Sequence, residues 1–448
     1  MFDPFVRRAM PGNPNNTRTI KVDMLARVEG EGALHVRVIE GRVEDVQLRI
    51  FEPPRFFEAF LKGRHFTEVP DIVARICGIC PIAYQMSAVH ALESLFGVDV
   101  GSAIRTLRRL IYCGEWIESH ALHIYLLHAP DFLGYESGIE MARDYPEIVK
   151  RGLRVKKAGN QLLTLLGGRS VHPVSVKVGG FTRVPSKREL EGLQEELLWA
   201  REAAVETLKW VSGFEFQDLE QPYIFVSLRS PHEYPMNEGL IASNQGLGIA
   251  HADFEMHFHE SQVPHSNALH CSLNGVSYLT GPLARVHLNF DQLTPFTKQV
   301  FLDAGLTLPL SRASLGIVAR AMEVLHALDE ALGIIDQYEA PSEPAVPVLV
   351  KAGTGMAATE APRGLLYHRY AVNQEGIITE AKIVPPTSQN QFRIEDDLRN
   401  ALPRILDLPN EDAALACERI IRSFDPCISC ATHFLKLDIK DVRGNSRK

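Results

Sequence analysis

The chain has 448 residues, of which 45% are hydrophobic and 23% are charged, and its formal net charge is −8. This composition is ordinary for a folded globular protein, and the length allows two or three average domains or one large domain. The acidic balance argues against nucleic acid as the main partner, because a phosphate-binding surface needs an excess of Lys and Arg. No apolar run approaches the roughly 20 residues that span a bilayer, and the N-terminal residues lack the apolar core of a secretory signal.

The first elements are expected to be strands, followed by helices. Residues 18–51 alternate apolar and polar side chains, which predicts an N-terminal antiparallel sheet with a hairpin turn at Glu40 and Gly41. From residue 56 the apolar period becomes helical, and several segments are long and apolar enough to be buried in a bundle. The expected helices cover residues 57–61, 82–96, 104–127, 145–166, 190–210 and 315–335.

A smaller β content is expected beyond these helices. Residues 222–298 are irregular and β-rich, with glycines at the turns, and residues 364–370 are strand-like. Two short helices are predicted over residues 394–402, ended by Pro403, and over residues 411–424.

We therefore predict an α+β fold that is mainly α, with a core of long helices, an N-terminal antiparallel sheet and smaller β-rich insertions. No linker clearly divides the chain, so residues 1–433 are expected to form one domain. Its parts are the β region over 18–51, the helical core with its β-rich insertion over 56–340, and a C-terminal region over 351–433.

Two pairs of cysteines stand out among the seven in the chain. The odd count and the length make a disulfide framework improbable, and apolar surroundings predict core positions for Cys113, Cys271 and Cys417. The other four form two Cys-x-x-Cys motifs near opposite ends of the chain, at Cys77 and Cys80 and at Cys427 and Cys430. If folding brings the pairs together, four thiolates would make a site for a soft metal such as nickel, iron, copper(I) or zinc.

Two simpler metal sites fit this spacing poorly. The cysteine pairs of a structural zinc ribbon usually lie some tens of residues apart, whereas nearly the whole chain separates these two. Iron–sulfur motifs also need four thiolates, but their cysteines usually cluster locally and are more numerous.

The sequence around the cysteines resembles the large subunit of nickel–iron hydrogenases. Residues 75–80 and 425–433 look like the first and last signatures of that family, and residues 27–30, 167–173 and 360–364 are similar to its internal motifs. The resemblance covers nearly the full length. The residues that follow Cys80 are most similar to those of the cytoplasmic, NAD(P)-linked branch of the family, the bifunctional hydrogenases or sulfhydrogenases.

This resemblance implies a bimetallic site. Cys77 and Cys427 would be terminal nickel ligands, and Cys80 and Cys430 would bridge nickel to an iron that carries carbon monoxide and two cyanides. Arg363, after Pro362, would stand as a fixed cation over the open nickel position.

The same resemblance implies the groups around the metals. Asp131 and Asp425 would hold the Arg363 guanidinium. Glu29 would be the first proton acceptor beyond the Cys427 thiolate, with Glu31 as a rival two residues later.

Three further features concern the C-terminus and the first cysteine pair. Glu58 and His433 would bind magnesium or iron near the C-terminus. An endopeptidase would cut between His433 and Phe434 and remove residues 434–448. The chain departs from many relatives at Tyr84, where they have a histidine; a phenol can donate one hydrogen bond to a bridging sulfur or simply pack in the core.

The implied activity is reversible splitting of H2 into protons and electrons. The chain has no spare cysteines for an iron–sulfur cluster, so electrons would leave through an iron–sulfur small subunit, with an NAD(P)-binding diaphorase and electron-transfer subunits behind it. Two alternatives remain: a hydrogenase subunit that feeds a heterodisulfide reductase or a sensor relay, and a non-catalytic structural subunit like the related subunit of respiratory complex I, which has lost the metal ligands.

Overall fold

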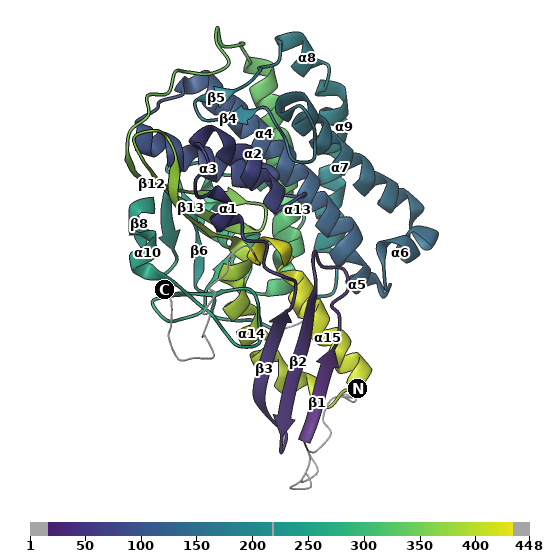
Figure 1. Ribbon diagram of the computed structural model, residues 1–448. Helices are drawn as coiled ribbons and strands as arrows, with labels where there is room; N and C mark the ends of the chain where they lie inside the picture. The colour runs from purple at the N-terminus through teal and green to yellow at the C-terminus, as the bar shows by residue number, and fades with distance from the viewer. Residues whose placement is uncertain (1–16, 217–218, 433–448) are drawn as a thin grey trace, which may run out of the picture.

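The computed structural model describes residues 17–216 and 219–432. Its centre is a bundle of long helices, in which α4 contacts α7 and α13, and α13 contacts α9 (Figure 1). A fifth long helix, α3, begins at Pro81, as the sequence predicts for a proline at the first helical position. The bounds are α3 (Pro81–Phe96), α4 (Gly101–Leu122), α7 (Pro146–Gly167), α9 (Gln194–Ser212) and α13 (Gly316–Gln337).

The predicted N-terminal sheet is confirmed and lies at one end of the molecule, beside α14 and α15 (Figure 1). Its antiparallel strands are β1 (Thr17–Val22), β2 (Gly32–Ile39) and β3 (Arg42–Ile50). Glu40 and Gly41 both have positive φ, at 51° and 73°, which suits a tight hairpin turn. The buried face of the sheet packs on α14 (Pro386–Ile405), and α15 (Asn410–Ser423) follows it.

A second three-stranded sheet covers α3. It consists of β12 (Gly353–Ala361), β13 (Gly364–Val372) and β14 (Ile378–Val384) in sequential antiparallel order. The sequence predicts strand only from residue 364, so β12 is an addition. Its glycines allow close packing, since a Cβ at Gly355 would lie 2.1 Å from the carbonyl oxygen of Ala91 on α3.

The insertion predicted to be β-rich contains small sheets and short helices. A four-stranded sheet has the order β11-β6-β7-β8, and β9 pairs with β10 as a separate hairpin. These strands are β6 (Phe225–Arg229), β7 (Leu240–Ser243), β8 (Gly248–Ile249), β9 (Phe258–Ser261), β10 (His270–Leu273) and β11 (Leu279–Thr280). The remaining elements of this part are α10 (Phe254–His257), α11 (Pro282–Asn289) and α12 (Pro295–Asp303).

Short elements complete the helical part. They are α1 (Phe57–Leu61), α2 (Val69–Val73), α5 (Ala129–Leu133), α6 (Gly138–Asp144), β4 (Val176–Lys177), β5 (Gly180–Phe181) and α8 (Lys187–Glu191). A wider π-helical turn, His123–His128, joins α4 to α5. The α+β, mainly α class is confirmed. Among the described residues, no helix is both long and apolar enough to cross a bilayer.

Two predicted helix boundaries are wrong. The helix expected over 394–402 begins eight residues earlier, with Pro386 in its first turn, and passes Pro403 to end at Ile405. Pro403 lacks the N–H that would bond the Arg399 carbonyl, so the last turn is weakened and the helix ends two residues later. The helix expected over 190–210 is divided at Gly192 into α8 and α9, although Gly213 does end it.

The close contact between α4 and α7 generates a stability prediction. A Cβ at Gly159 on α7 would lie 2.6 Å from the carbonyl oxygen of Gly114 on α4. We expect Gly159→Ala to lower the free energy of unfolding by about 1–3 kcal/mol, because the helices must move apart. The matched control is Gly333→Ala on α13, where an added Cβ meets nothing within 4 Å and helix propensity favours alanine. Chemical denaturation followed by circular dichroism measures both; equal midpoints would contradict the prediction.

Candidate metal centre

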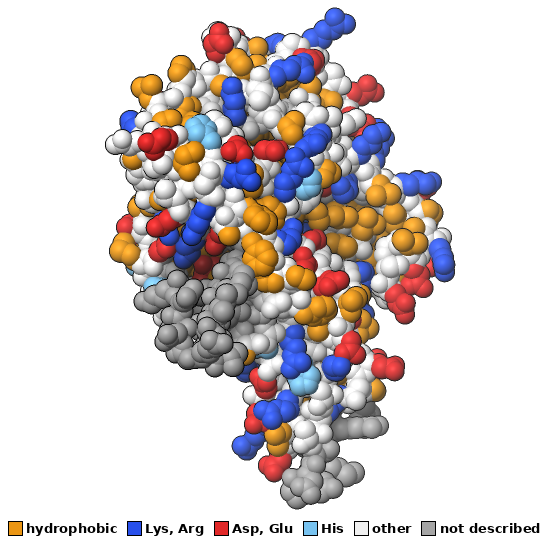
Figure 2. Space-filling model, viewed as in Figure 1, with side chains coloured by type: hydrophobic (Ala, Val, Ile, Leu, Met, Phe, Trp, Pro, Cys, Tyr) orange, Lys and Arg blue, Asp and Glu red, His pale blue; other side chains and the backbone are white. Residues whose placement is uncertain are grey.

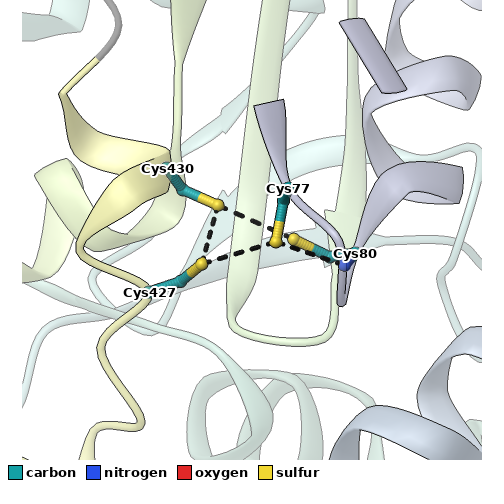
Figure 3. A group of neighbouring side chains, drawn as sticks. All are labelled: Cys77, Cys80, Cys427 and Cys430. Carbon is teal, nitrogen blue, oxygen red and sulfur yellow. Dashed lines mark hydrogen bonds between the residues drawn. The ribbon is translucent and has the colours of Figure 1, made fainter. Parts of the chain in front are cut away.

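The four paired cysteines converge in the interior (Figure 3). The sulfur atoms of Cys77 and Cys427 lie 3.5 Å apart, those of Cys80 and Cys430 3.8 Å apart, and those of Cys427 and Cys430 2.8 Å apart. All four sulfurs lie within 4.8 Å of one another, and every one of these side chains is buried. The predicted meeting of the two distant motifs is therefore confirmed.

The start of α3 fixes the first pair. Cys77 follows a short helical turn, and its sulfur accepts hydrogen bonds from the backbone N–H groups of Ile79 (3.3 Å) and Cys80 (3.4 Å). Glu115 on α4 accepts N–H groups from Ile82 (2.6 Å) and Ala83 (3.0 Å), which would otherwise be unpaired at the helix start. This buried carboxylate therefore locks the backbone directly after Cys80.

The N-terminal turn and α14 fix the second pair. The backbone N–H of Cys427 donates to the Thr387 hydroxyl on α14 at 3.0 Å, and that of Ile428 donates to the Glu29 carbonyl at 2.9 Å. Gly30 has φ 89°, and a Cβ there would lie 2.7 Å from the Cβ of Ile428. The glycine of this turn thus lets the N-terminal segment approach the cysteine loop.

The same turn brings a carboxylate to a thiol. The Cys427 thiol donates to Glu29 Oε2 at 3.1 Å, and the N–H of Ser429 donates to the same oxygen at 3.1 Å. Glu31 is exposed, and its own N–H donates to Glu52 instead. Of the two acids considered from the sequence, the structure places Glu29 at the cysteines.

Arg363 lies at the turn between β12 and β13 and is buried, with 3% of its surface exposed. Its Nε donates to the Asp425 carbonyl at 2.8 Å, and its Nη2 donates to Asp425 Oδ1 at 3.1 Å. Burial opposes its charge, but Asp425 and the cysteine thiolates raise the pKa of Arg363 well above its usual value. Its Nη1 is buried without a hydrogen-bond partner, which leaves the N–H groups of this nitrogen for a further anionic group.

Asp131 does not hold Arg363, so this expectation is wrong. Its carboxylate pairs with Arg422 on α15 through two 2.8 Å hydrogen bonds and with Arg27 at 2.6 Å. The reason is that α5 packs beside the π-helical turn, which faces α15. The second cation near Asp425 is Arg320, whose Nε lies 4.0 Å from Oδ2.

A buried ion network that no sequence motif indicated supports the Arg363 turn. Arg285 donates to the carbonyl oxygens of Ala361 (2.8 Å) and Pro362 (2.9 Å). Its guanidinium also pairs with Glu323 (2.7 Å) and Glu360 (3.0 Å), and all three charged side chains are fully buried. The available signal was the presence of Glu323 and Arg320 inside an otherwise apolar helix pattern, since unpaired charges are rarely buried.

The remaining predicted positions have different outcomes. Glu58 accepts the N–H of Ile383 at 2.8 Å, whereas His433 and Phe434 lie outside the described residues. Tyr84 is buried beside His368, with 5.7 Å between ring centroids, and burial together with the Cys430 charge raises its pKa.

Two histidines, one on α4 and one in the turn after it, are buried in the core. His120 bonds Glu323 at 2.9 Å, and His123 bonds the Arg422 carbonyl at 2.9 Å. Their different partners agree with core packing.

The donor set fits a soft metal centre. Burial raises the pKa of the Cys427 and Cys430 thiols, whereas hydrogen bonds from neighbouring thiols, that of Cys427 first, lower the pKa of Cys77. Four thiolates at these distances would repel each other strongly without a cation. Metal binding would displace the shared protons, and soft sulfur ligands suit nickel and iron.

The comparisons with known proteins agree with this geometry. The family described as nickel-dependent hydrogenase matches residues 55–147 and 274–433. The alpha subunit of sulfhydrogenase 2 from Pyrococcus furiosus is 33% identical, over 93% of this chain and 100% of that protein. The beta subunit of the NAD-reducing hydrogenase HoxS from Cupriavidus necator is 25% identical, over 94% of this chain and 95% of that protein.

A solved structure shows the same fold. The crystal structure of an NAD+-reducing NiFe-hydrogenase in the H2-reduced state matches with a TM-score of 0.84 at 26% identity, covering 94% of this chain and 100% of that one. The family match extends over more than half of the chain and includes all four site cysteines. This chain therefore belongs to the nickel-dependent hydrogenases, as a large subunit.

Proposed function

We propose that this catalytic subunit splits H2 heterolytically and reversibly, and that the electrons pass through an iron–sulfur small subunit to NAD(P)+. The observation that carries the chemistry is the convergence of four buried thiols beside a buried, partly unpartnered guanidinium. Two similar proteins support the acceptor: the HoxS hydrogenase, which is NAD-reducing, and the solved hydrogenase, which is NAD+-reducing. The F420-non-reducing hydrogenases among the relatives favour a second candidate, delivery of the electrons to another acceptor.

The four cysteines would hold the metals in two roles. Cys77 and Cys427 would be terminal ligands of nickel, and Cys80 and Cys430 would bridge nickel to an iron that carries carbon monoxide and two cyanides. When bound, this centre supplies the electron acceptor that H–H cleavage needs. The chain's own contribution is a buried, fixed set of four sulfur ligands, positioned by Glu115, Thr387 and the Glu29 turn.

Arg363 would hold negative charge at the centre. The Nε and Nη2 atoms of Arg363 donate hydrogen bonds to Asp425, so Nη1 remains able to donate a hydrogen bond to another group. A cyanide ligand is an anionic acceptor of the kind that this free donor requires. Pro362, whose carbonyl accepts a hydrogen bond from Arg285, would keep the Arg363 guanidinium in this position.

Glu29 would remove the proton from the site. The thiol of Cys427 already donates to its carboxylate at 3.1 Å, which is within the reach of direct proton transfer from sulfur to oxygen. The N–H of Ser429 holds the same carboxylate oxygen. The proton would thus leave along the N-terminal turn.

Partner proteins would receive the electrons. Figure 2 shows hydrophobic side chains gathered over α6 and α7 on the face in view. The exposed apolar residues of these two helices include Ile139 and Leu153. An exposed apolar patch suits a protein partner such as the small subunit, with a diaphorase behind it.

We place the complex in the cytoplasm, where pyridine nucleotides are available. We also assign a second metal, magnesium or iron, to Glu58 and His433.

The function is tested first through Cys430→Ser in the purified complex. We expect loss of nickel and iron from the large subunit and a fall in H2-dependent dye reduction of at least about 100-fold, because a hydroxyl is a poor ligand for these soft metals. Cys417→Ser, at a buried cysteine away from the site, is the control and should keep the metals. Metal analysis and the infrared bands of carbon monoxide and cyanide measure the outcome, and a nickel-free parent complex would contradict the proposal. The electron acceptor is tested separately, by H2-dependent reduction of NAD+ or NADP+ in the parent complex.

Glu29→Gln tests the proton route. The amide keeps the shape and can still accept the Ser429 N–H, but it cannot take the Cys427 proton. We therefore expect normal nickel content and a fall of about 100-fold or more in turnover and in H2/D2O exchange. Glu31→Gln is the matched control and should turn over at the parent rate; equal rates for the two variants would refute the route.

Arg363→Lys tests the fixed cation. Lysine keeps the charge but cannot bond Asp425 at two points and a third acceptor at the same time. We expect turnover to fall by at least about 10-fold, with a shift in the cyanide infrared bands. Arg399→Lys on the exposed side of α14 is the control, and unchanged cyanide bands in Arg363→Lys would contradict the assigned contact.

A further inference from the structure

A second cluster of ligating side chains lies away from the cysteines. His265, His270 and Glu395 bring one ligand atom each within 4.8 Å of one another. His265 lies in the loop between β9 and β10, His270 begins β10, and Glu395 lies in the middle of α14. Two imidazoles and one carboxylate are a common donor set for a divalent transition metal.

The polar atoms of this cluster are incompletely paired by the protein. Glu395 Oε1 accepts from the Leu48 N–H (2.8 Å) and contacts His265 Nε2 (2.8 Å). Glu395 Oε2 lies 3.8 Å from His270 Nε2, which is too far for a hydrogen bond. That His270 nitrogen is buried and has no hydrogen-bond partner, although unpaired buried groups are costly.

A bound metal would account for this separation. Ligand atoms about 2.1 Å from a tetrahedral metal lie about 3.4 Å from each other, which is close to the gap between His270 and Glu395. The charge also fits, because among the described residues no Lys or Arg forms an ion pair with the buried Glu395 carboxylate.

We infer that His265, His270 and Glu395 bind a divalent transition ion of the zinc type, with water as a fourth ligand, at a site separate from the hydrogen-activating centre. Two imidazole nitrogens among three protein ligands favour a transition ion over magnesium and calcium, which prefer sets made mainly of oxygen ligands. Such a metal would join the β9–β10 hairpin to α14, and Glu395 connects both to β3 by accepting the Leu48 N–H. Asn267 strengthens the same junction by donating its N–H to the Ile50 carbonyl at 2.7 Å.

The position of the site gives it a structural role for the cysteine centre. α14 also carries Thr387, which holds the Cys427 N–H. The hairpin loop reaches the strand end after β3, where Asn267 donates to the Glu52 carbonyl, and Glu52 accepts the Glu31 N–H. A metal here would therefore clamp α14 to the segment that supports the Glu29 turn.

The test is the zinc content of the purified complex, made in zinc-supplemented medium, desalted and measured together with nickel. We expect the parent to contain about one zinc per large subunit more than His270→Ala and His265→Ala, at equal nickel content. The matched control is His259→Ala, at an exposed histidine on β9, which should keep the zinc. Equal zinc in the parent and in both ligand variants would overturn the inference and favour a bridging water or a plain His265–Glu395 pair.

X-ray absorption at the zinc edge of the parent keeps the test decisive if a variant fails to fold. We expect only nitrogen and oxygen neighbours, at about 2.0–2.1 Å. Sulfur neighbours at about 2.3 Å would place the zinc at the cysteines and overturn the inference. Neither result depends on turnover, so this test can fail while the proposed hydrogenase activity stands.

Discussion

The structure depends on the meeting of two thiol pairs that are separated by almost the whole chain. Four sulfurs within 4.8 Å of one another are unfavourable in a dry interior, because burial penalises thiolates and neighbouring negative charges repel. Folding must therefore overcome this cost with contacts elsewhere, and metal binding would turn the repulsion into attraction. The fold around the cysteines can be understood as the set of contacts that keeps these groups together.

Those contacts are made mostly by backbone groups. The Glu115 carboxylate accepts hydrogen bonds from the N–H groups that follow Cys80, and the Thr387 hydroxyl accepts one from the N–H of Cys427. The carbonyl of Glu29 accepts a further one from the N–H of Ile428. Backbone hydrogen bonds restrict position more than side-chain packing alone, since they are directional. The N-terminal sheet therefore does more than cover a core: it delivers a carboxylate to a sulfur.

The sequence predicted the parts of the site that short motifs specify. The four cysteines were found because each pair forms a Cys-x-x-Cys motif with a chemical meaning, whereas Glu29 was assigned only from the resemblance to the hydrogenase family. Asp131 was misassigned, since a sequence shows that an acid needs a basic partner but not which arginine the fold supplies. Strand β12 was missed because its glycines and alanines carry no clear alternation, whereas its role depends on close packing against α3, a tertiary effect.

Charge around the cysteines is arranged asymmetrically. Arg320 and Arg363 flank Asp425, and burial lowers the pKa of Arg320 to about 10, which still leaves it cationic at neutral pH. One carboxylate thus faces two guanidiniums, whereas a second carboxylate, that of Glu29, lies at the Cys427 sulfur. In the proposed centre, two divalent metals would balance four thiolates, and the two cyanides would remain as excess negative charge. The protein side of the site is therefore preorganised for an anionic metal complex. A single divalent ion in the same four thiolates would carry the same excess negative charge, so the buried, unpaired Nη1 of Arg363, rather than net charge, favours a centre that carries cyanide.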